Sequence, residues 1–186
     1  WDPPFTGAAA REPRKALINE IYRTTTRMWE NNAVDSHMHL VAKEYIRTRR
    51  PRVLFVGYGE TDEWAHGGNY DLVLQSAHRV DGYIKDLWTT MQAMPEYRGT
   101  TTFIVTTDHG RGDGPSAWRD HGQEVQGAEH IWMAIMGPDT PAGGVATTGV
   151  VTQDQVAATV AALLGKDYAQ FAPRAGRPLE VLRSRR

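Results

Sequence analysis

The sequence predicts an α/β fold in which a mainly parallel sheet carries helices on both faces. Three short apolar runs, rich in β-branched residues, lie at 52–58, 102–107 and 131–136. Such runs are typical of strands buried on both faces of a parallel sheet. Segments with helical spacing of apolar residues separate them, and this alternation favours parallel connections. We therefore expect the three runs to lie in one sheet.

The region before the first predicted strand is expected to be mostly helical. Residues 1–13 contain three prolines and are predicted to be an extended lead-in. From 14 to 29, apolar residues recur at helical spacing. A second helix is predicted over 35–50, because Asp35 can cap its start and Pro51 ends it.

The remaining elements follow from the same patterns. Residues 69–93 predict a long amphipathic helix, and a glycine-rich loop is expected over 110–127. A last helix is predicted from Thr152 to Leu164, and the basic tail 183–186 is expected to be a solvated end.

Composition limits the class of protein. The chain has 186 residues, 40% hydrophobic and 23% charged, which suits a single domain over 1–186. A net charge of −1 argues against a nucleic-acid partner. No apolar run approaches the roughly 20 residues of a membrane span.

Because there is no cysteine, a metal would have to be held by Asp, Glu or His. Composition leaves the oligomeric state open.

Polar clusters follow the first two predicted strands. The first is Gly59–His66, and the second is Thr107–Gly110. Ligands of open α/β sheets bind just past the carboxyl ends of strands. Asp62 and His66 are four residues apart, so one helical turn places both on the same side. Carboxylate and imidazole are the ligands expected for zinc and related divalent ions.

The second cluster and the loop after it supply further candidate ligands. Asp108 and His109 are adjacent and would point apart unless the backbone turns sharply, which Gly110 permits. His121 in the glycine-rich loop is the favoured third ligand, and His130 is the alternative, although it leads directly into a strand. Each pattern alone is common on surface helices and in turns, so their combination carries the prediction.

These stretches carry a family resemblance. GETDEWAH, the helix NYDLVLQSAHRVDGYI and the run TTFIVTTDHGRG…WRDHG…IWMAIMGP resemble the C-terminal part of the alkaline phosphatase superfamily. That superfamily includes phosphatases, phosphodiesterases, sulfatases and cofactor-independent phosphoglycerate mutases. The resemblance covers roughly residues 50–165 and implies a metal-dependent hydrolase of small anionic phosphoric or sulfuric esters.

The resemblance also implies roles for individual residues. Asp62, His66 and His121 would bind one ion, while Asp108 and His109 would help to bind a second. Two divalent ions are expected, zinc or alternatively manganese, which clamp the attacking and leaving oxygens of an in-line displacement. Independently of the resemblance, Arg111 directly follows Asp-His-Gly and can contact an anionic substrate; a surface arginine on a mobile loop is an equal alternative.

The chain also departs from the superfamily pattern. Members carry an apolar strand ending in a metal-binding Asp and a Ser or Thr nucleophile near their N-terminus. Here Asp2 precedes two prolines with no strand before it, and Thr24–Thr26 lies in a helical pattern. We expect an alkaline phosphatase-like fold whose N-terminal, nucleophile-bearing half is missing from this chain. The start at Trp1, without Met or signal peptide, also suggests a processed product or fragment.

Alternatives remain at the level of function. The chain could belong to an ester hydrolase, or be a catalytically incomplete metal-binding remnant with a structural or interaction role. Because the relatives it resembles mostly carry export signals, a periplasmic or secreted parent protein is expected. His37 and His39 resemble the His-x-His motif of amidohydrolase barrels, but a barrel usually needs about 250 residues. We expect His37 and His39 on a helix surface and Arg79 in solvent.

Overall fold

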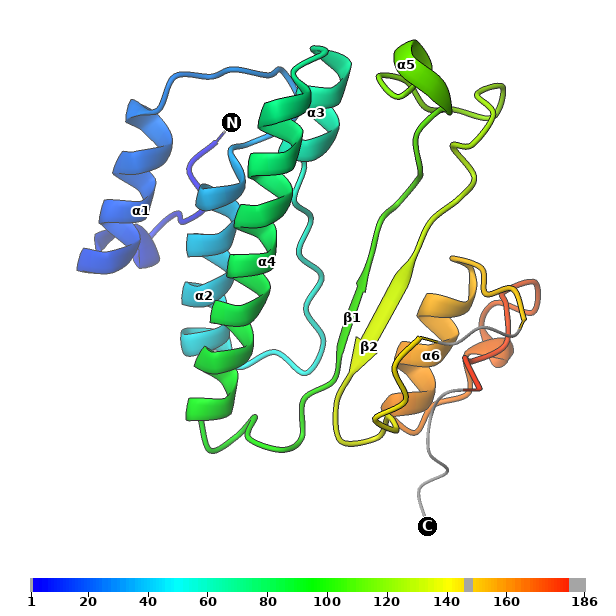
Figure 1. Ribbon diagram of the computed structural model, residues 1–186. Helices are drawn as coiled ribbons and strands as arrows, with labels where there is room; N and C mark the ends of the chain where they lie inside the picture. The colour runs from blue at the N-terminus through cyan, green and yellow to red at the C-terminus, as the bar shows by residue number, and fades with distance from the viewer. Residues whose placement is uncertain (1, 146–148, 181–186) are drawn as a thin grey trace.

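The computed structural model describes residues 2–145 and 149–180. Figure 1 shows helices α1 to α4 on one side of two strands, β1 and β2, and helix α6 on the other side. The C-terminal tail 183–186, predicted to be solvated, lies outside the described residues. Within the described ranges, no helix combines the length and apolar content that crossing a bilayer requires.

The helices predicted over 14–29, 35–50 and 69–93 are present, although the first ends at Thr24, and a short additional helix carries Asp62 and His66. They are α1 (Pro13–Thr24), α2 (Asp35–Arg49), α3 (Glu60–His66) and α4 (Tyr70–Ala93). Pro13 suits the first position of α1, because its fixed φ matches the helix and its missing N–H has no helical partner there. Arg50 ends α2 in the left-handed conformation with φ 47°. A 3-10 helix, Ala9–Arg11, interrupts the lead-in predicted to be extended.

The apolar core of this region lies among the helices. Ile18 and Tyr22 of α1, Ala42 and Ile46 of α2, and Leu87 of α4 are buried, with Ile46 only 1% exposed. Periodicity predicts these inward faces, since residues three or four apart on a helix share one side. Helix α4 also packs against α3, the helix that carries Asp62 and His66.

The sheet differs from the prediction. Strands β1 (Phe103–Thr106) and β2 (Met133–Met136) pair antiparallel, with Phe103 opposite Met136. The predicted parallel arrangement of these two runs is therefore wrong. Their connection contains only the short helix α5 (Gly114–Ala117) and returns the chain to the end of the sheet that it left. A parallel partner would need a crossover, usually a longer helix, to carry the chain back to the other end.

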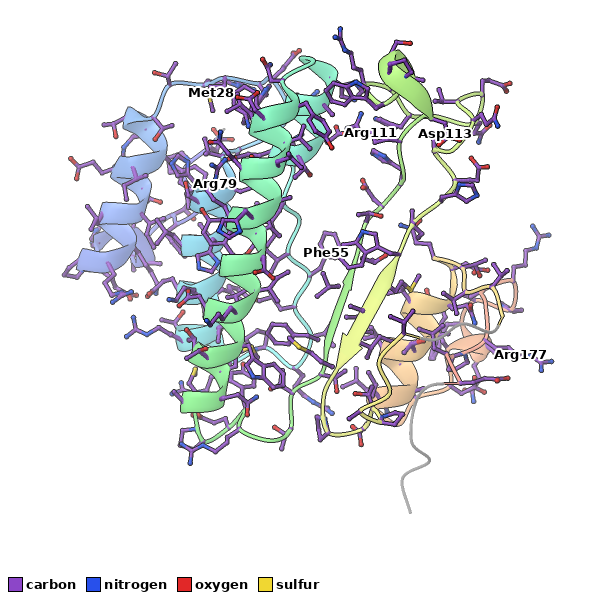
Figure 2. The ribbon with its side chains drawn as sticks, viewed as in Figure 1. Met28, Phe55, Arg79, Arg111, Asp113 and Arg177 are labelled. Carbon is purple, nitrogen blue, oxygen red and sulfur yellow. The ribbon has the colours of Figure 1, made fainter. Side chains whose placement is uncertain are left out.

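The run 52–58 also departs from the prediction. Of the described residues, only β1 and β2 form a sheet, so 52–58 does not join it. Val53 is 54% exposed and Phe55, labelled in Figure 2, is 92% exposed. Apolar, β-branched composition predicts an extended chain. Whether a neighbouring strand pairs with that chain through backbone hydrogen bonds depends on the tertiary structure.

The last described elements are helix α6 (Gln155–Leu163) and the 3-10 helix Tyr168–Gln170. The predicted helix of this region is confirmed, and Gly165 follows its end with φ 70°.

Candidate metal centre

Asp62 lies at the centre of a cluster of carboxylate and imidazole groups. Its Oδ1 atom is 3.5 Å from His109 Nε2 and 3.5 Å from His121 Nε2. One ligand atom from each of these three residues lies within 4.8 Å of the others. The residues come from α3, from the turn after β1 and from the loop after α5. The predicted convergence of these segments is therefore present.

His66 completes the cluster from the same helix as Asp62. Its Nε2 lies 3.6 Å from Asp62 Oδ2 and 3.1 Å from His121 Nε2. As expected for residues four apart, both side chains are on one side of α3. On its other edge, Nδ1 faces Asp120 Oδ1 at 3.9 Å. His66 therefore lies beside the group formed by Asp62, His109 and His121.

The histidines of the loops are held in a form that suits ligation. His109 Nδ1 lies 2.9 Å from the carbonyl oxygen of Gly110. A proton on Nδ1 would donate to that carbonyl and leave the Nε2 lone pair directed at Asp62. Burial, followed by the neighbouring His109, lowers the pKa of His121. Neutral imidazole is the form that binds metals, so both effects favour a metal site.

Gly110 permits the sharp turn that brings His109 inward. Its N–H donates to the carbonyl of Ala128 at 2.7 Å. A Cβ atom at this position would lie 2.3 Å from the carbonyl oxygen of His130. The close approach of the two backbones therefore requires glycine.

Asp108 is less involved than predicted. Its side chain is 85% exposed, and its Oδ1 accepts from the N–H of His109 at 3.1 Å. Its backbone carbonyl accepts from Gln153 Nε2 at 3.0 Å. The resemblance pairs Asp108 with His109 at a second ion; in the structure His109 Nε2 lies 3.7 Å from Asp108 Oδ1 and 3.5 Å from Asp62 Oδ1.

Arg111 is directed at the cluster itself. Its guanidinium donates to Asp62 Oδ1 and, at 3.0 Å, to the Asp62 carbonyl. It also donates to the carbonyl of Arg119 at 2.8 Å. Figure 2 shows Arg111 between α3 and the loop that carries α5. Arg111 therefore supplies a positive charge where the candidate ligands meet, and its substrate-binding role stays a prediction.

The alternative ligand His130 lies elsewhere. Its side chain is 79% exposed and approaches Glu129 Oε1 at 3.9 Å. The structure thus brings His121, and not His130, to Asp62. Trp64 packs edge-on against Trp29, and Trp118 packs edge-on against Tyr70, so both tryptophans contact neighbouring segments.

The prediction that His37 and His39 lie on a helix surface is wrong. They are 5% and 7% exposed. His39 Nε2 pairs with Asp86 at 2.7 Å, and its Nδ1 lies 3.1 Å from the Tyr58 hydroxyl. Helix α2 contacts both α1 and α4, so more than one of its faces is covered.

Arg79 is not a free solvated side chain either. It is ion-paired with Glu60 at 2.7 Å. Glu60 is buried at the start of α3, beside Asp35. The sequence analysis did not predict the Arg79–Glu60 ion pair or the proximity of Glu60 to Asp35. The one signal for the latter was that an acidic residue begins both α2 and α3.

An α/β chain in which one carboxylate and two imidazoles converge beside a strand end, with a third imidazole next to them, has the donor set of a metal-binding protein. Comparison with known families agrees with this class. The chain belongs to the type I phosphodiesterase / nucleotide pyrophosphatase family, whose profile matches residues 2–174, and so to the alkaline phosphatase superfamily.

A curated relative lies in the same superfamily. The chain is 32% identical over 115 residues to a 2,3-bisphosphoglycerate-independent phosphoglycerate mutase of Gracilaria tenuistipitata var. liui. The match covers 60% of this chain but only 20% of that protein, so the chain spans about a fifth of the relative's length. No solved structure matches the chain significantly.

Proposed function

We propose that the chain supplies the Asp and His ligands of a metal-dependent hydrolase of phosphoric or sulfuric esters. The observation that carries the proposal is the convergence of Asp62, His109 and His121 within 4.8 Å. Membership of the phosphodiesterase family supports the ester substrate class. A small anionic ester is the proposed substrate.

The donor set fits a zinc ion. Ligand atoms bound about 2.0–2.1 Å from a tetrahedral ion lie roughly 3.3–3.4 Å from one another. Asp62 Oδ1 lies 3.5 Å from the Nε2 atoms of His109 and His121, and Asp62 Oδ2 lies 3.6 Å from that of His66. An imidazole-rich set favours zinc over manganese, which prefers oxygen ligands. Manganese remains the alternative.

Each residue then has a chemical role. Asp62, His66, His109 and His121 would hold one divalent ion, and Asp108 would contribute to a second. When bound, such ions polarise the ester oxygens and stabilise the charge that develops on them. Arg111, released from Asp62, would bind and orient the anionic group through its guanidinium fork.

The nucleophile is proposed to lie outside this chain. Thr61 and Thr107 are the nearest hydroxyl residues in sequence to the ligands and would be the first candidates if this is incorrect. Covalent transfer needs an activated hydroxyl held against the metals. The 186-residue chain alone should therefore show little or no turnover.

Isothermal titration with zinc and manganese tests the metal site, and nitrophenyl phosphate, phosphodiester and sulfate test turnover. Asp62→Ala removes the central ligand, and Asp81→Ala removes an exposed carboxylate of α4 as the matched control. We expect tight binding in the wild type and in Asp81→Ala, and a loss of at least about tenfold in Asp62→Ala. Equal affinity in all three would overturn the site. Robust turnover abolished by Asp62→Ala would place a nucleophile in this chain.

A second function, a metal-binding remnant with a structural or interaction role, is favoured by one observation. The Asp108 carboxylate is 85% exposed and is not among the described residues whose ligand atoms converge, Asp62, His109 and His121, which supports a chain that holds a single ion. Tight binding of one zinc ion, with weak turnover that Asp62→Ala leaves unchanged, would support this remnant.

We also propose that the parent protein is periplasmic or secreted. The support is the export signals common among the proteins it resembles. Fractionation of cells that express the full-length gene tests this, and recovery only from the cytoplasm would contradict it.

A further inference from the structure

Helices α2 and α3 begin side by side, and each supplies the acidic group that binds the other's first N–H groups. Asp35 Oδ1 accepts from the N–H of Gly59 at 2.8 Å and of Glu60 at 3.2 Å. In return, Glu60 Oε1 accepts from the N–H of Asp35 at 2.9 Å. The first N–H groups of a helix have no partner inside it. The two side chains satisfy these groups across 25 residues of sequence.

Electrostatics favours acidic side chains between the N-termini of α2 and α3. Helix N-termini carry partial positive charge, so two adjacent N-termini repel unless negative groups lie between them. Asp35 and Glu60 are 2% and 3% exposed, and both lie at this junction. Ser76 donates to Glu60 Oε2 at 3.1 Å, and Arg79 pairs with the same atom at 2.7 Å. Helix α4 therefore holds Glu60 from the other side.

The Asp35 carboxylate is more than a stabilising contact. Its second oxygen, Oδ2, is buried and has no hydrogen-bond partner among the described residues. Burying a polar atom without a partner is destabilising. The unpaired Oδ2 atom reduces the net stabilisation that Asp35 gives to the fold. The two hydrogen bonds of Oδ1 to the start of α3 point to a role in orienting that helix.

Helix α3 depends on its surroundings for its orientation. It has only seven residues, too few to be stable in isolation. Asp62 lies two residues after Glu60, and His66 lies one helical turn after Asp62. Any rotation of the start of α3 would therefore move both ligands away from His109 and His121.

We propose that Asp35 and Glu60 are positioning residues for the candidate metal centre, orienting α3 through their reciprocal hydrogen bonds. The inference rests on the proposed function, because its consequence is metal affinity. Neither residue is one of the candidate ligands. Their effect passes through the backbone of α3.

Four variants separate positioning from general stability. Asp35→Ala removes the acceptor, whereas Asp35→Asn keeps an acceptor oxygen for the two N–H groups. Glu60→Ala removes the reciprocal bond. Asp86→Ala is the matched control, because Asp86 binds His39 and Lys43 and so links α4 to α2 rather than to α3.

Zinc affinity is measured by competition with a chromophoric chelator, and thermal unfolding by circular dichroism. We expect Asp35→Ala and Glu60→Ala to weaken zinc binding about 10- to 100-fold, the loss typical when groups that orient metal ligands are removed. Asp35→Asn should restore affinity to within about threefold of wild type, consistent with a hydrogen-bond role. Asp86→Ala should lower the unfolding temperature while changing zinc affinity by less than about threefold. The double variant Asp35→Ala/Glu60→Ala should lose less than the product of the single losses, since both changes release the same junction.

Zinc affinity of folded Asp35→Ala equal to wild type would overturn the inference, as would an equal loss in Asp86→Ala. If Asp35→Ala does not fold, Asp35→Ser, which keeps a shorter acceptor, takes its place and must still bind zinc more weakly than Asp35→Asn. A wild type that does not bind zinc would overturn the proposed metal site and this inference with it. Zinc binding that is abolished by Asp62→Ala but unaffected by Asp35→Ala and Glu60→Ala would remove only the positioning role.

Discussion

The imidazole ring of His109 stacks on that of His121, with centroids 3.6 Å apart and planes inclined by 12°. The two residues belong to different loops, and both Nε2 atoms lie 3.5 Å from Asp62 Oδ1. Two stacked imidazolium ions would repel, so the stack favours neutral rings. Neutral rings are the form that ligates a divalent ion.

The first prediction separates the two loop histidines. His121→Ala should weaken zinc binding by at least about tenfold, because the ring next to Asp62 is lost. His130→Ala, which removes a ring 79% exposed beside Glu129, should change it by less than about threefold. Calorimetric titration of both variants measures this. A larger loss in His130→Ala would mean that the loop rearranges when the ion binds.

The second prediction concerns Arg111, whose guanidinium occupies Asp62 Oδ1. Arg111→Gln should bind zinc several-fold more tightly than wild type, because the ion no longer competes with a cation for the carboxylate. The zinc-loaded variant should bind inorganic phosphate more weakly, since the bidentate donor is gone. Titrations with zinc, then with phosphate, measure both effects. Unchanged zinc affinity would show that the ion pair does not compete with the metal.

The third prediction compares two glycines. Gly110→Ala should weaken zinc binding and destabilise the chain, because the new methyl group meets the His130 carbonyl at 2.3 Å. Gly82→Ala, inside α4 with no atom within 4 Å of the new methyl group, should stabilise the chain by about 0.5–1 kcal/mol and leave zinc binding unchanged. Urea unfolding and zinc titration check the pair. Wild-type behaviour of Gly110→Ala would contradict the close backbone approach.

The fourth prediction is a pH dependence at Asp35. Burial raises the pKa of its carboxyl from 3.8 to about 6, and nearby Glu60 also raises it, although the N–H groups of Gly59 and Glu60 and the charge of Arg79 lower it. The folded chain therefore binds this proton more tightly than the unfolded chain. The contribution of Asp35 to stability is largest below pH 4 and is lost as pH rises through about 6.

Asp35→Asn removes this titration and provides the comparison. The free energy of unfolding of wild type, relative to that of Asp35→Asn, should fall between pH 4 and pH 6.5 by up to about 3 kcal/mol. Urea unfolding with EDTA present, at intervals across this range, measures the difference. Parallel curves for the two proteins would show that the pKa of Asp35 is not raised.

Local patterns predicted much of this chain. The helices α1, α2, α4 and α6 follow from apolar spacing and from residues such as Pro51 and Gly165 at their ends. The grouping of Asp62, His66 and His121 was also predictable, because helical spacing and glycine-rich loops limit where these side chains can point. Their ligand roles stay predictions.

Strand pairing was not predictable in the same way. Composition marks the runs 102–107 and 131–136 as strands, but direction depends on how the 26 residues between β1 and β2, 107–132, fold back. The same composition in 52–58 yields an exposed segment outside the sheet. A β-ladder needs a partner strand, and local sequence patterns do not predict which segment will be that partner.

What the sequence by itself determined is the set of helices, the types of ligand available and the family to which their order belongs, because these depend on residues close together in the chain. Tertiary structure alone decided that Arg111 lies on Asp62, that His37 and His39 are buried, and that Asp35 and Glu60 bind each other's helix. These contacts join segments 25 or more residues apart, or depend on which neighbours cover a helix face. The energies of these contacts come from desolvation and from hydrogen bonds between groups distant in sequence. The periodicity of apolar residues depends only on near neighbours in the chain, so it does not predict such contacts.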